Sequence, residues 1–368
     1  MSMGIEAVAA TREGSIVTAH VEFGLDTFGD VTVDLDGNRL SQAQTIRNLV
    51  EQGVLADELG LDFFGVGEHH RADFAVSSPE TVLAAIAART KQIKLGTAVT
   101  VLSSDDPVRV YQRFATVDAI SGGRAEAVLG RGSFTESFPL FGFDLTDYND
   151  LFEEKLALFA KLRDEDVVHH RGRLRPDIHG IRVYPTTEHK HGIPTWVGVG
   201  GSPESVVRTA KYGMRLMLAV IGGHPGRFAP YVNLFRQAEA QFGGEPQLVG
   251  IHSPGHVGAT DAEAKEEFWE HYQVLMNTIG AERGWTPMTQ MQFQNEVAAG
   301  SLYVGSPETV ARRIATTVQT LGLDRFDVKY ANGTLPHELM LGSIERYATQ
   351  VVPMVRELLA EAADNDAE

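Results

Sequence analysis

The stretch that decides the fold reads VGEHH at residues 66 to 70, IKLGTAVTVLSSDDPVRV at 93 to 110 and ATVDAISGGRAEAVLGRG at 115 to 132. Each segment contains a short apolar run that ends among glycine and polar or charged residues. In parallel α/β barrels, binding and catalytic groups lie at the carboxyl ends of the strands. The three segments therefore predict neighbouring strands that carry a binding site at one end of a sheet.

Working outward, apolar runs of strand length alternate with longer segments at helical spacing. This alternation is typical of a parallel β/α barrel. We expect eight strands at residues 21–23, 63–66, 93–101, 125–129, 195–199, 216–221, 248–251 and 326–328. We expect helices at residues 43–59, 81–90, 108–120, 148–163, 203–212, 227–242, 262–277, 308–321 and 337–359. The predicted fold class is α/β, a TIM-like (β/α)8 barrel with insertions at strand ends.

The length of 368 residues fits one elaborated barrel, because barrels of this class exceed the usual domain size. We expect a single domain over residues 1–368, with insertions near 164–193 and 252–304. Long excursions at strand ends often form lids or pocket walls. The acidic residues 361–368 are expected to fray.

Composition excludes several classes of function. With 32 basic and 49 acidic residues, the formal net charge of -17 repels nucleic-acid phosphates and anionic lipids, so neither nucleic acid nor membrane is an expected partner. The same acidic balance also keeps a protein soluble, so it identifies no substrate. The absence of cysteine excludes disulfides, thiolate metal sites and a cysteine nucleophile. Without a secretory start or a long apolar run, the predicted location is the cytoplasm.

The phrase Ser-Pro-Glu occurs three times, at residues 78–80, 202–204 and 306–308. Serine at the N-cap accepts backbone N–H bonds, proline fits the first helical position, and glutamate suits the positive end of the helix dipole. Each copy therefore predicts the start of a helix.

The middle copy also predicts an anion site, because the glycine-rich run WVGVGG at 196–201 precedes it. Glycines between a strand and a capped helix let backbone N–H groups approach an anion. We expect a ligand phosphate at Gly200, Gly201, Ser202 and Ser205. The motif is neither a Walker sequence nor a full GxGxxG, and a tight strand-to-helix turn is the alternative.

Arg131 is a second candidate for the same anion. It lies between two glycines at the end of the predicted fourth strand, next to the strand that leads to the glycine-rich run. A guanidinium there is suited to clamp a phosphate from the neighbouring strand. The alternative is an ion pair with Glu126 or Glu136 on the barrel rim.

Glu68, His69 and His70 end the second predicted strand. A histidine at that place is suited to general acid–base catalysis or to hydrogen bonding of a ligand. Strand alternation sends the two histidines to opposite sides, and we favour His69 as the one facing the pocket, with a structural histidine as the alternative. No metal site is expected, since the 13 histidines form no HExxH pattern, and no GxSxG elbow indicates a serine hydrolase.

Taken together, these motifs resemble the bacterial luciferase-like family of flavin-dependent monooxygenases. The resemblance extends from Phe23 to Tyr330. It rests on GEHH at 67–70, LGTAVTVL at 95–102, DPVR at 106–109, DAISGGRAE at 118–126, GRG at 130–132 and GVGGSPES at 198–205. The family fold is a β/α barrel that binds reduced FMN, or in some branches a deazaflavin coenzyme, at the carboxyl ends of the strands.

The resemblance also implies roles for individual residues. Ala98 and Val99 would form a non-proline cis peptide beneath the flavin ring, and His69 would be the catalytic histidine. The implied ligands of the flavin phosphate are Arg131, Ser202 and Ser205, with Glu68 and Gly201 close to the cofactor. Bacterial luciferase carries a reactive cysteine at the position of Gly130, so this chain is not expected to emit light or to oxidise long-chain aldehydes.

The implied function is a monooxygenase that uses reduced FMN from a separate flavin reductase, together with O2, to oxidise a small organic substrate. Two alternatives remain open: a deazaflavin-dependent reductase or dehydrogenase of the same fold, and a flavin-binding protein without chemistry. The resemblance further suggests a homodimer, or a higher homo-oligomer, through the alanine-rich helix around residues 81–88, for which ordinary packing on the barrel is the alternative.

Overall fold

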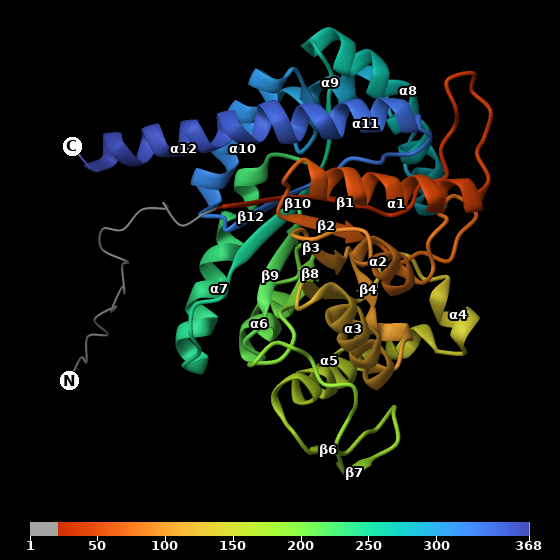
Figure 1. Ribbon diagram of the computed structural model, residues 1–368, viewed down its shortest axis with the longest axis vertical. Coiled ribbons are helices and arrows are strands. Elements are labelled where there is room, and N and C mark those ends of the chain that lie inside the picture. The colour runs from red at the N-terminus through yellow and green to blue at the C-terminus, as the bar shows by residue number, and fades with distance from the viewer. Residues whose placement is uncertain (1–20, 368) are drawn as a thin grey trace.

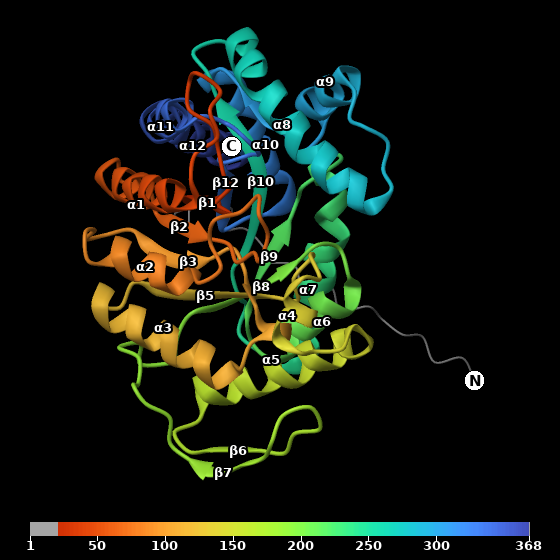
Figure 2. The same ribbon diagram turned by 90° about the vertical axis from the view of Figure 1, so that its right-hand side faces the viewer.

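The structure is a computed structural model that describes residues 21–367, and these residues form a closed parallel barrel surrounded by helices (Figures 1 and 2). The barrel strands are β1 (Glu22–Thr27), β2 (Phe63–Val66), β3 (Lys94–Thr97), β5 (Ala125–Gly130), β8 (Thr195–Val199), β9 (Arg215–Ala219), β10 (Val249–Val257) and β12 (Arg325–Lys329). Parallel pairing runs in this order from β1 to β12, and β12 pairs with β1 to close the ring. The predicted fold class is confirmed, with all eight strands in the expected order.

Four shorter strands lie outside this ring. Strand β4 (Thr100–Val101) continues from β3 and pairs with β5, and β11 (Tyr303–Gly305) pairs with the end of β10. Strands β6 (Val168–His170) and β7 (Ile178–Ile181) form an antiparallel hairpin. This hairpin lies at the opposite end of the molecule from α8 and α9 (Figures 1 and 2).

Helices cover the outside of the barrel and bury the apolar side chains that the strands direct outward, such as Phe23 and Leu25. The helices are α1 (Gln42–Glu58), α2 (Pro79–Ala87), α3 (Pro107–Ser121), α4 (Ser137–Phe141), α5 (Tyr148–Asp164), α6 (Pro203–Lys211), α7 (Ala229–Phe242), α8 (Asp261–Arg283), α9 (Gln290–Ala299), α10 (Pro307–Leu321), α11 (His337–Arg346) and α12 (Val352–Ala367). None of the described helices is both long and apolar enough to cross a membrane.

All three Ser-Pro-Glu phrases begin helices, as predicted, with proline at the first position of α2, α6 and α10. The side chains of Ser202 and Ser306 accept the expected backbone N–H bonds. Ser78 makes no such bond, so in α2 the proline and the glutamate act without a serine cap. The phrase therefore locates the helix start even where one of its contacts is missing.

Inside the barrel, below the carboxyl ends of the strands, lies a buried ionic layer. The guanidinium of Arg325, which is 0% exposed, pairs with Glu126 at 2.7 Å and lies 4.4 Å from the ring centroids of Phe63 and Trp196. Arg215 pairs with the other oxygen of Glu126 at 3.0 Å. Burial alone would raise the pKa of Glu126, but the charges of Arg325 and Arg215 outweigh it and lower the pKa to about 2. The layer is thus charged, compensated and part of the core.

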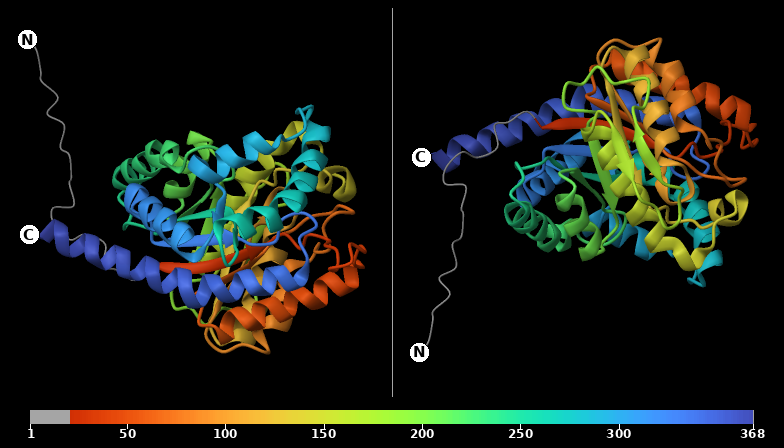
Figure 3. Two further views of the ribbon diagram at one scale, coloured as in Figure 1. Left: turned by 90° about the horizontal axis from the view of Figure 1, so that it is seen from above. Right: turned by 90° about the horizontal axis from the view of Figure 1, so that it is seen from below.

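The excursion expected at 252–304 begins later, because β10 continues to Val257 and places His252 inside a barrel strand. The acidic residues 361–367, which are expected to fray, form the last turns of α12. This helix runs out past the barrel toward the C-terminus (Figure 3).

Candidate active site

A cavity of about 630 Å³ opens at the carboxyl ends of the barrel strands. We divide its lining into two regions. The β3–β8 side consists of Ala98, Val99, Gly130, Arg131, Gly198 and Gly200. The β10–β1 side consists of Asp26, Ala219, His252, Asp327 and Lys329. The rest of the lining includes the α8 wall, made of Tyr272, Leu275, Met276 and Ile279.

Val99 forms the floor of the β3–β8 side. The peptide bond between Ala98 and Val99 is cis, as the resemblance predicts. A Cβ atom added at Gly130 would lie 2.5 Å from Val99 Cγ2, and one at Gly198 would lie 2.9 Å from Val99 Cγ1. The valine therefore fits between two strands only because both positions are glycine, and it lines the cavity with an apolar side chain.

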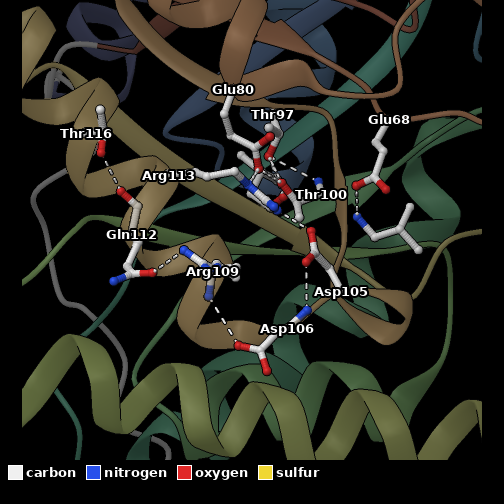
Figure 4. Close-up of polar contacts among 12 residues, drawn as sticks. Glu68, Glu80, Thr97, Thr100, Asp105, Asp106, Arg109, Gln112, Arg113 and Thr116 are labelled. Atoms are coloured by element: carbon white, nitrogen blue, oxygen red, sulfur yellow. Dashed lines mark hydrogen bonds and ion pairs between the residues drawn. The ribbon is translucent and has the colours of Figure 1, made fainter. Parts of the chain in front are cut away.

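A buried polar network holds the Thr97–Val101 segment in place (Figure 4). Thr97 Oγ1 donates to the carbonyl oxygen of Val128 at 2.8 Å and accepts from the N–H of Thr100 at 3.1 Å. The carboxylate of Glu68 accepts from the N–H of Val101 at 2.8 Å. The segment is thus tied to β5 through Val128 and to the end of the loop after β2 through Glu68.

Arg131 extends from the end of β5, where its Nη1 donates to Asn149 Oδ1 at 2.8 Å and its guanidinium lies 5.4 Å from the ring centroid of Tyr148. The alternative pairing with Glu126 is wrong, because Glu126 lies in the ionic layer below. The hydroxyl of Ser202 lowers the pKa of Glu204, and the charge of Arg131 adds to that effect. The guanidinium thus extends beyond the end of β5 to Asn149 and Tyr148, and its place in an anion clamp stays a prediction.

The glycine-rich run reaches the cavity at Gly198 and Gly200. Gly200 lines the cavity, and a Cβ atom added there would meet no atom within 4 Å. Gly201 has a φ of +120°, and its carbonyl oxygen accepts from the hydroxyl of Tyr231 at 3.0 Å. Ser202 and Ser205 lie behind it in the helix start, where the Ser202 hydroxyl donates to Glu204 at 2.7 Å. Open space is therefore present at Gly200, while the predicted serines do not line the cavity.

Glu68 has a structural task in addition to its place at the cavity. One oxygen accepts from Val101 N, and the other lies 2.9 Å from His70 Nε2. Both histidines of the motif line the cavity, so the expectation that only one faces it is wrong. The reason is that β2 ends at Val66 and the strict alternation of a strand stops before the histidines.

His69 lies among aromatic rings. Its ring centroid is 4.4 Å from that of Phe74, 4.8 Å from that of Phe28 and 5.1 Å from that of Phe134. Burial, with a smaller contribution from the charges of Lys329 and Arg71, lowers the pKa of His69 to about 3. The imidazole is therefore neutral at physiological pH and is suited to hydrogen bonding rather than to carrying a proton.

Sequence reasoning missed the β10–β1 side. His252 Nδ1 lies 2.7 Å from Asp26 Oδ2, and Asp26 is 1% exposed. Lys329 pairs with Asp30 at 3.2 Å and lies 4.6 Å from the ring centroid of Phe28. The available signal was a charged or polar residue within an otherwise apolar strand, which places that side chain inside the barrel.

Comparison with known proteins agrees with this geometry. The family model for luciferase-like monooxygenases matches residues 22–325. The alkanal monooxygenase alpha chain of Photorhabdus luminescens is 24% identical over 362 residues, which covers 90% of this chain and 97% of the relative.

Three solved structures share the fold. Monooxygenase RslO1 from Streptomyces bottropensis has a TM-score of 0.78 at 22% identity, over 90% of this chain and 99% of that one. The oxygenating constituent of 3,6-diketocamphane monooxygenase from Pseudomonas putida, in complex with FMN, has a TM-score of 0.71 at 18% identity, over 90% and 98%. An F420-dependent secondary alcohol dehydrogenase has a TM-score of 0.70 at 17% identity, over 91% and 99%. With the family model covering most of the barrel, this chain belongs to the luciferase-like monooxygenase family and is a flavin-dependent oxidoreductase.

Proposed function

We propose that this protein is a monooxygenase that binds reduced FMN on the β3–β8 side of the cavity and uses O2 to oxidise a small organic substrate. The observation that carries the proposal is the combination of an apolar floor at Val99 with Arg131 and the open space at Gly200. A planar ring system fits the floor, and a phosphate fits the clamp between β5 and α6.

The residues of the chain have distinct tasks in this proposal. Arg131 and the backbone at Gly200 bind the phosphate, and Ser202 and Ser205 shape the helix start behind it. Ala98 and Val99 support one face of the ring, with Glu68 fixing that segment from β2. When bound, reduced FMN supplies the electrons for activation of O2. The chain itself positions the reactants and excludes water, which the apolar α8 wall favours.

His69 is proposed as the catalytic histidine that the resemblance implies. Because its pKa is lowered to about 3, it acts as a neutral hydrogen-bonding group whose orientation is set by Phe28, Phe74 and Phe134. Replacement by phenylalanine would keep the packing and remove the hydrogen bond. We expect His69→Phe to retain FMN binding and to lower turnover.

A second candidate is hydride transfer with a deazaflavin coenzyme, favoured by the F420-dependent dehydrogenase of similar fold. The same floor and clamp suit that coenzyme, whose ring and phosphate resemble those of FMN. The two candidates differ in their need for O2. The non-catalytic alternative, a flavin-binding protein, would bind the cofactor and turn over no substrate.

The proposal includes a separate flavin reductase and a homodimer. Helix α2 buries Val82, Leu83 and Ile86 against the barrel and leaves Thr81 and Ala85 exposed, so its small outer residues are suited to close helix packing. Light scattering of the purified protein coupled to gel filtration tests the dimer. A monomer at micromolar concentration would contradict it.

The decisive experiment is anaerobic titration with reduced FMN and, in parallel, with the reduced deazaflavin coenzyme, followed by admission of O2. Tight binding of reduced FMN and slow, protein-dependent reoxidation support the monooxygenase. Preference for the deazaflavin, with no effect of O2, supports the second candidate. Binding of neither cofactor contradicts both.

A further inference from the structure

We propose that His252, oriented by Asp26, binds the hydroxyl group of a phenolic, otherwise apolar substrate on the β10–β1 side of the cavity. The inference deepens the proposed function and rests on it, since it takes the β3–β8 side as the place of the flavin. Asp26 is then a positioning residue, and His252 is the residue that contacts the substrate.

The geometry of the pair determines what His252 presents to the cavity. Its Nδ1 lies 2.7 Å from Asp26 Oδ2, and a carboxylate oxygen accepts, so Nδ1 carries the hydrogen. In the neutral ring, Nε2 then holds a lone pair. Nε2 has no hydrogen-bond partner among residues 21–367, and the ring, 9% exposed, lines the cavity. An acceptor so placed requires a donor on the ligand.

The neighbouring charged groups do not compete for the hydrogen bond at His252 Nε2. Lys329 is bound to Asp30 and to the carbonyl oxygen of Ala331. Burial raises the pKa of Asp327 well above its usual value; Arg325 opposes this and Asp26 adds to it. The carboxylate that contacts His252 is that of Asp26.

Aromatic and aliphatic side chains line the same cavity as the pair. Phe28 stacks on the His252 ring with 5.8 Å between centroids and an interplanar angle of 27°. Phe134, Trp285 and the α8 wall line the same cavity. Aromatic walls favour a flat ring that packs against their faces and edges. Because a phenolic O–H is a stronger donor than an aliphatic one, a phenol matches both the walls and the imidazole acceptor.

The test compares 2-naphthol with 2-methoxynaphthalene, which has the same ring but no donor. Isothermal titration of the full-length protein should give binding of 2-naphthol about tenfold tighter, the value of one good hydrogen bond. The absorbance band of bound 2-naphthol should also shift toward that of the naphtholate, because the imidazole draws the hydroxyl proton. Equal affinity for the two probes in the wild-type protein would overturn the inference without any variant.

Two variants locate the acceptor. His252→Phe should lose both the preference and the band shift while still binding 2-methoxynaphthalene, and retention of both would overturn the inference. Asp26→Asn should reduce the band shift, because the tautomer of His252 is no longer fixed. If His252→Phe does not fold, Asp26→Asn decides: an unchanged band shift would contradict the role of the pair.

His256→Asn is the matched control. His256 lies on the same strand and pairs with a carboxylate, Glu267, at 2.6 Å, but it does not line the cavity. This variant should keep the tenfold preference for 2-naphthol. Loss of the preference would mean that any disturbance of β10 abolishes it, and would overturn the assignment to His252.

The failure of this inference and of the proposed function are distinguishable. Saturating FMN should leave the affinity for 2-naphthol within about twofold if the two sides are separate, and full displacement would overturn the inference. The titration with reduced FMN is read independently. Tight reduced-FMN binding without hydroxyl preference refutes only the inference, whereas hydroxyl preference without binding of either cofactor refutes the proposed function.

Discussion

The two sides of the cavity differ in how they are built. The β3–β8 side is formed largely by backbone, with a cis peptide and three glycines, and by one arginine side chain. These residues lie at the ends of strands that follow one another along the chain. The β10–β1 side is made of buried charged and polar side chains whose partners lie far apart, such as Asp26 and His252, separated by 226 residues. The first side therefore depends on the local shape of the backbone, whereas the second depends on contacts made across the barrel.

The largest expected effect concerns the ionic layer beneath both sides. Glu126→Gln would leave the buried charges of Arg325 and Arg215 partly uncompensated. We expect a loss of about 3–5 kcal/mol in the free energy of unfolding, measured by urea denaturation. Glu245→Gln, which replaces an exposed loop residue, is the control and should change the free energy of unfolding little. An effect below about 1 kcal/mol would mean that the two sides do not depend on this common layer.

The next prediction separates the two sides by cofactor binding. Arg131→Ala should weaken binding of reduced FMN roughly 10- to 100-fold, because one charge-assisted contact to the phosphate is lost. Arg283→Ala is the matched control, since Arg283 lines the cavity near Phe134 and Trp285 rather than at the start of α6. Anaerobic fluorescence titration measures both. Equal weakening by the two substitutions would contradict the division of the cavity.

His69 allows a test by pH. Because its pKa is about 3 in the folded protein, lower than in the unfolded chain, the unfolded state takes up a proton first as the pH falls. The contribution of His69 to the free energy of unfolding is therefore fully present above about pH 6.5 and decreases between about pH 6.5 and 3. Between pH 7.5 and 5.0, the free energy of unfolding of His69→Gln should fall by about 2 kcal/mol less than that of the wild-type protein, measured by urea denaturation. Parallel curves for the two proteins would refute the lowered pKa.

The smallest effect concerns the connection between the loop after β2 and the C-terminal end of α8. Arg71 Nη1 donates to Glu282 Oε2 at 2.8 Å, and Arg71 Nε pairs with Asp73 at 3.0 Å. Because Glu282 is half exposed, Arg71→Ala should cost less than about 1 kcal/mol of global stability. Hydrogen exchange at the C-terminal end of α8 should nevertheless become faster. Arg47→Ala, on the exposed face of α1, is the control, and equal exchange in the two variants would contradict the connection.

Much of the β3–β8 side was predictable because its features are local. The glycines at 130, 198 and 200 and the capped start of α6 are visible as short motifs, whereas the cis peptide at Ala98 was implied by the family resemblance. The placing of Ser202 and Ser205 at the ligand stays a prediction. In the structure the Ser202 hydroxyl caps the helix start and donates to Glu204. Helix capping and phosphate binding use the same residues in sequence, and only the path of the backbone distinguishes them.

By itself, the sequence determined the eight-stranded barrel, the helix starts and the strand ends where a site lies, because alternation, capping and glycine act within a few residues. The tertiary structure decided which side chains meet inside the barrel. Asp26 reaches His252 only because β12 stands between β1 and β10 in parallel register, pairing Asp26 with Lys329 and His252 with Asp327. Closure of the ring fixes that register, and no short stretch of sequence encodes a contact made across it.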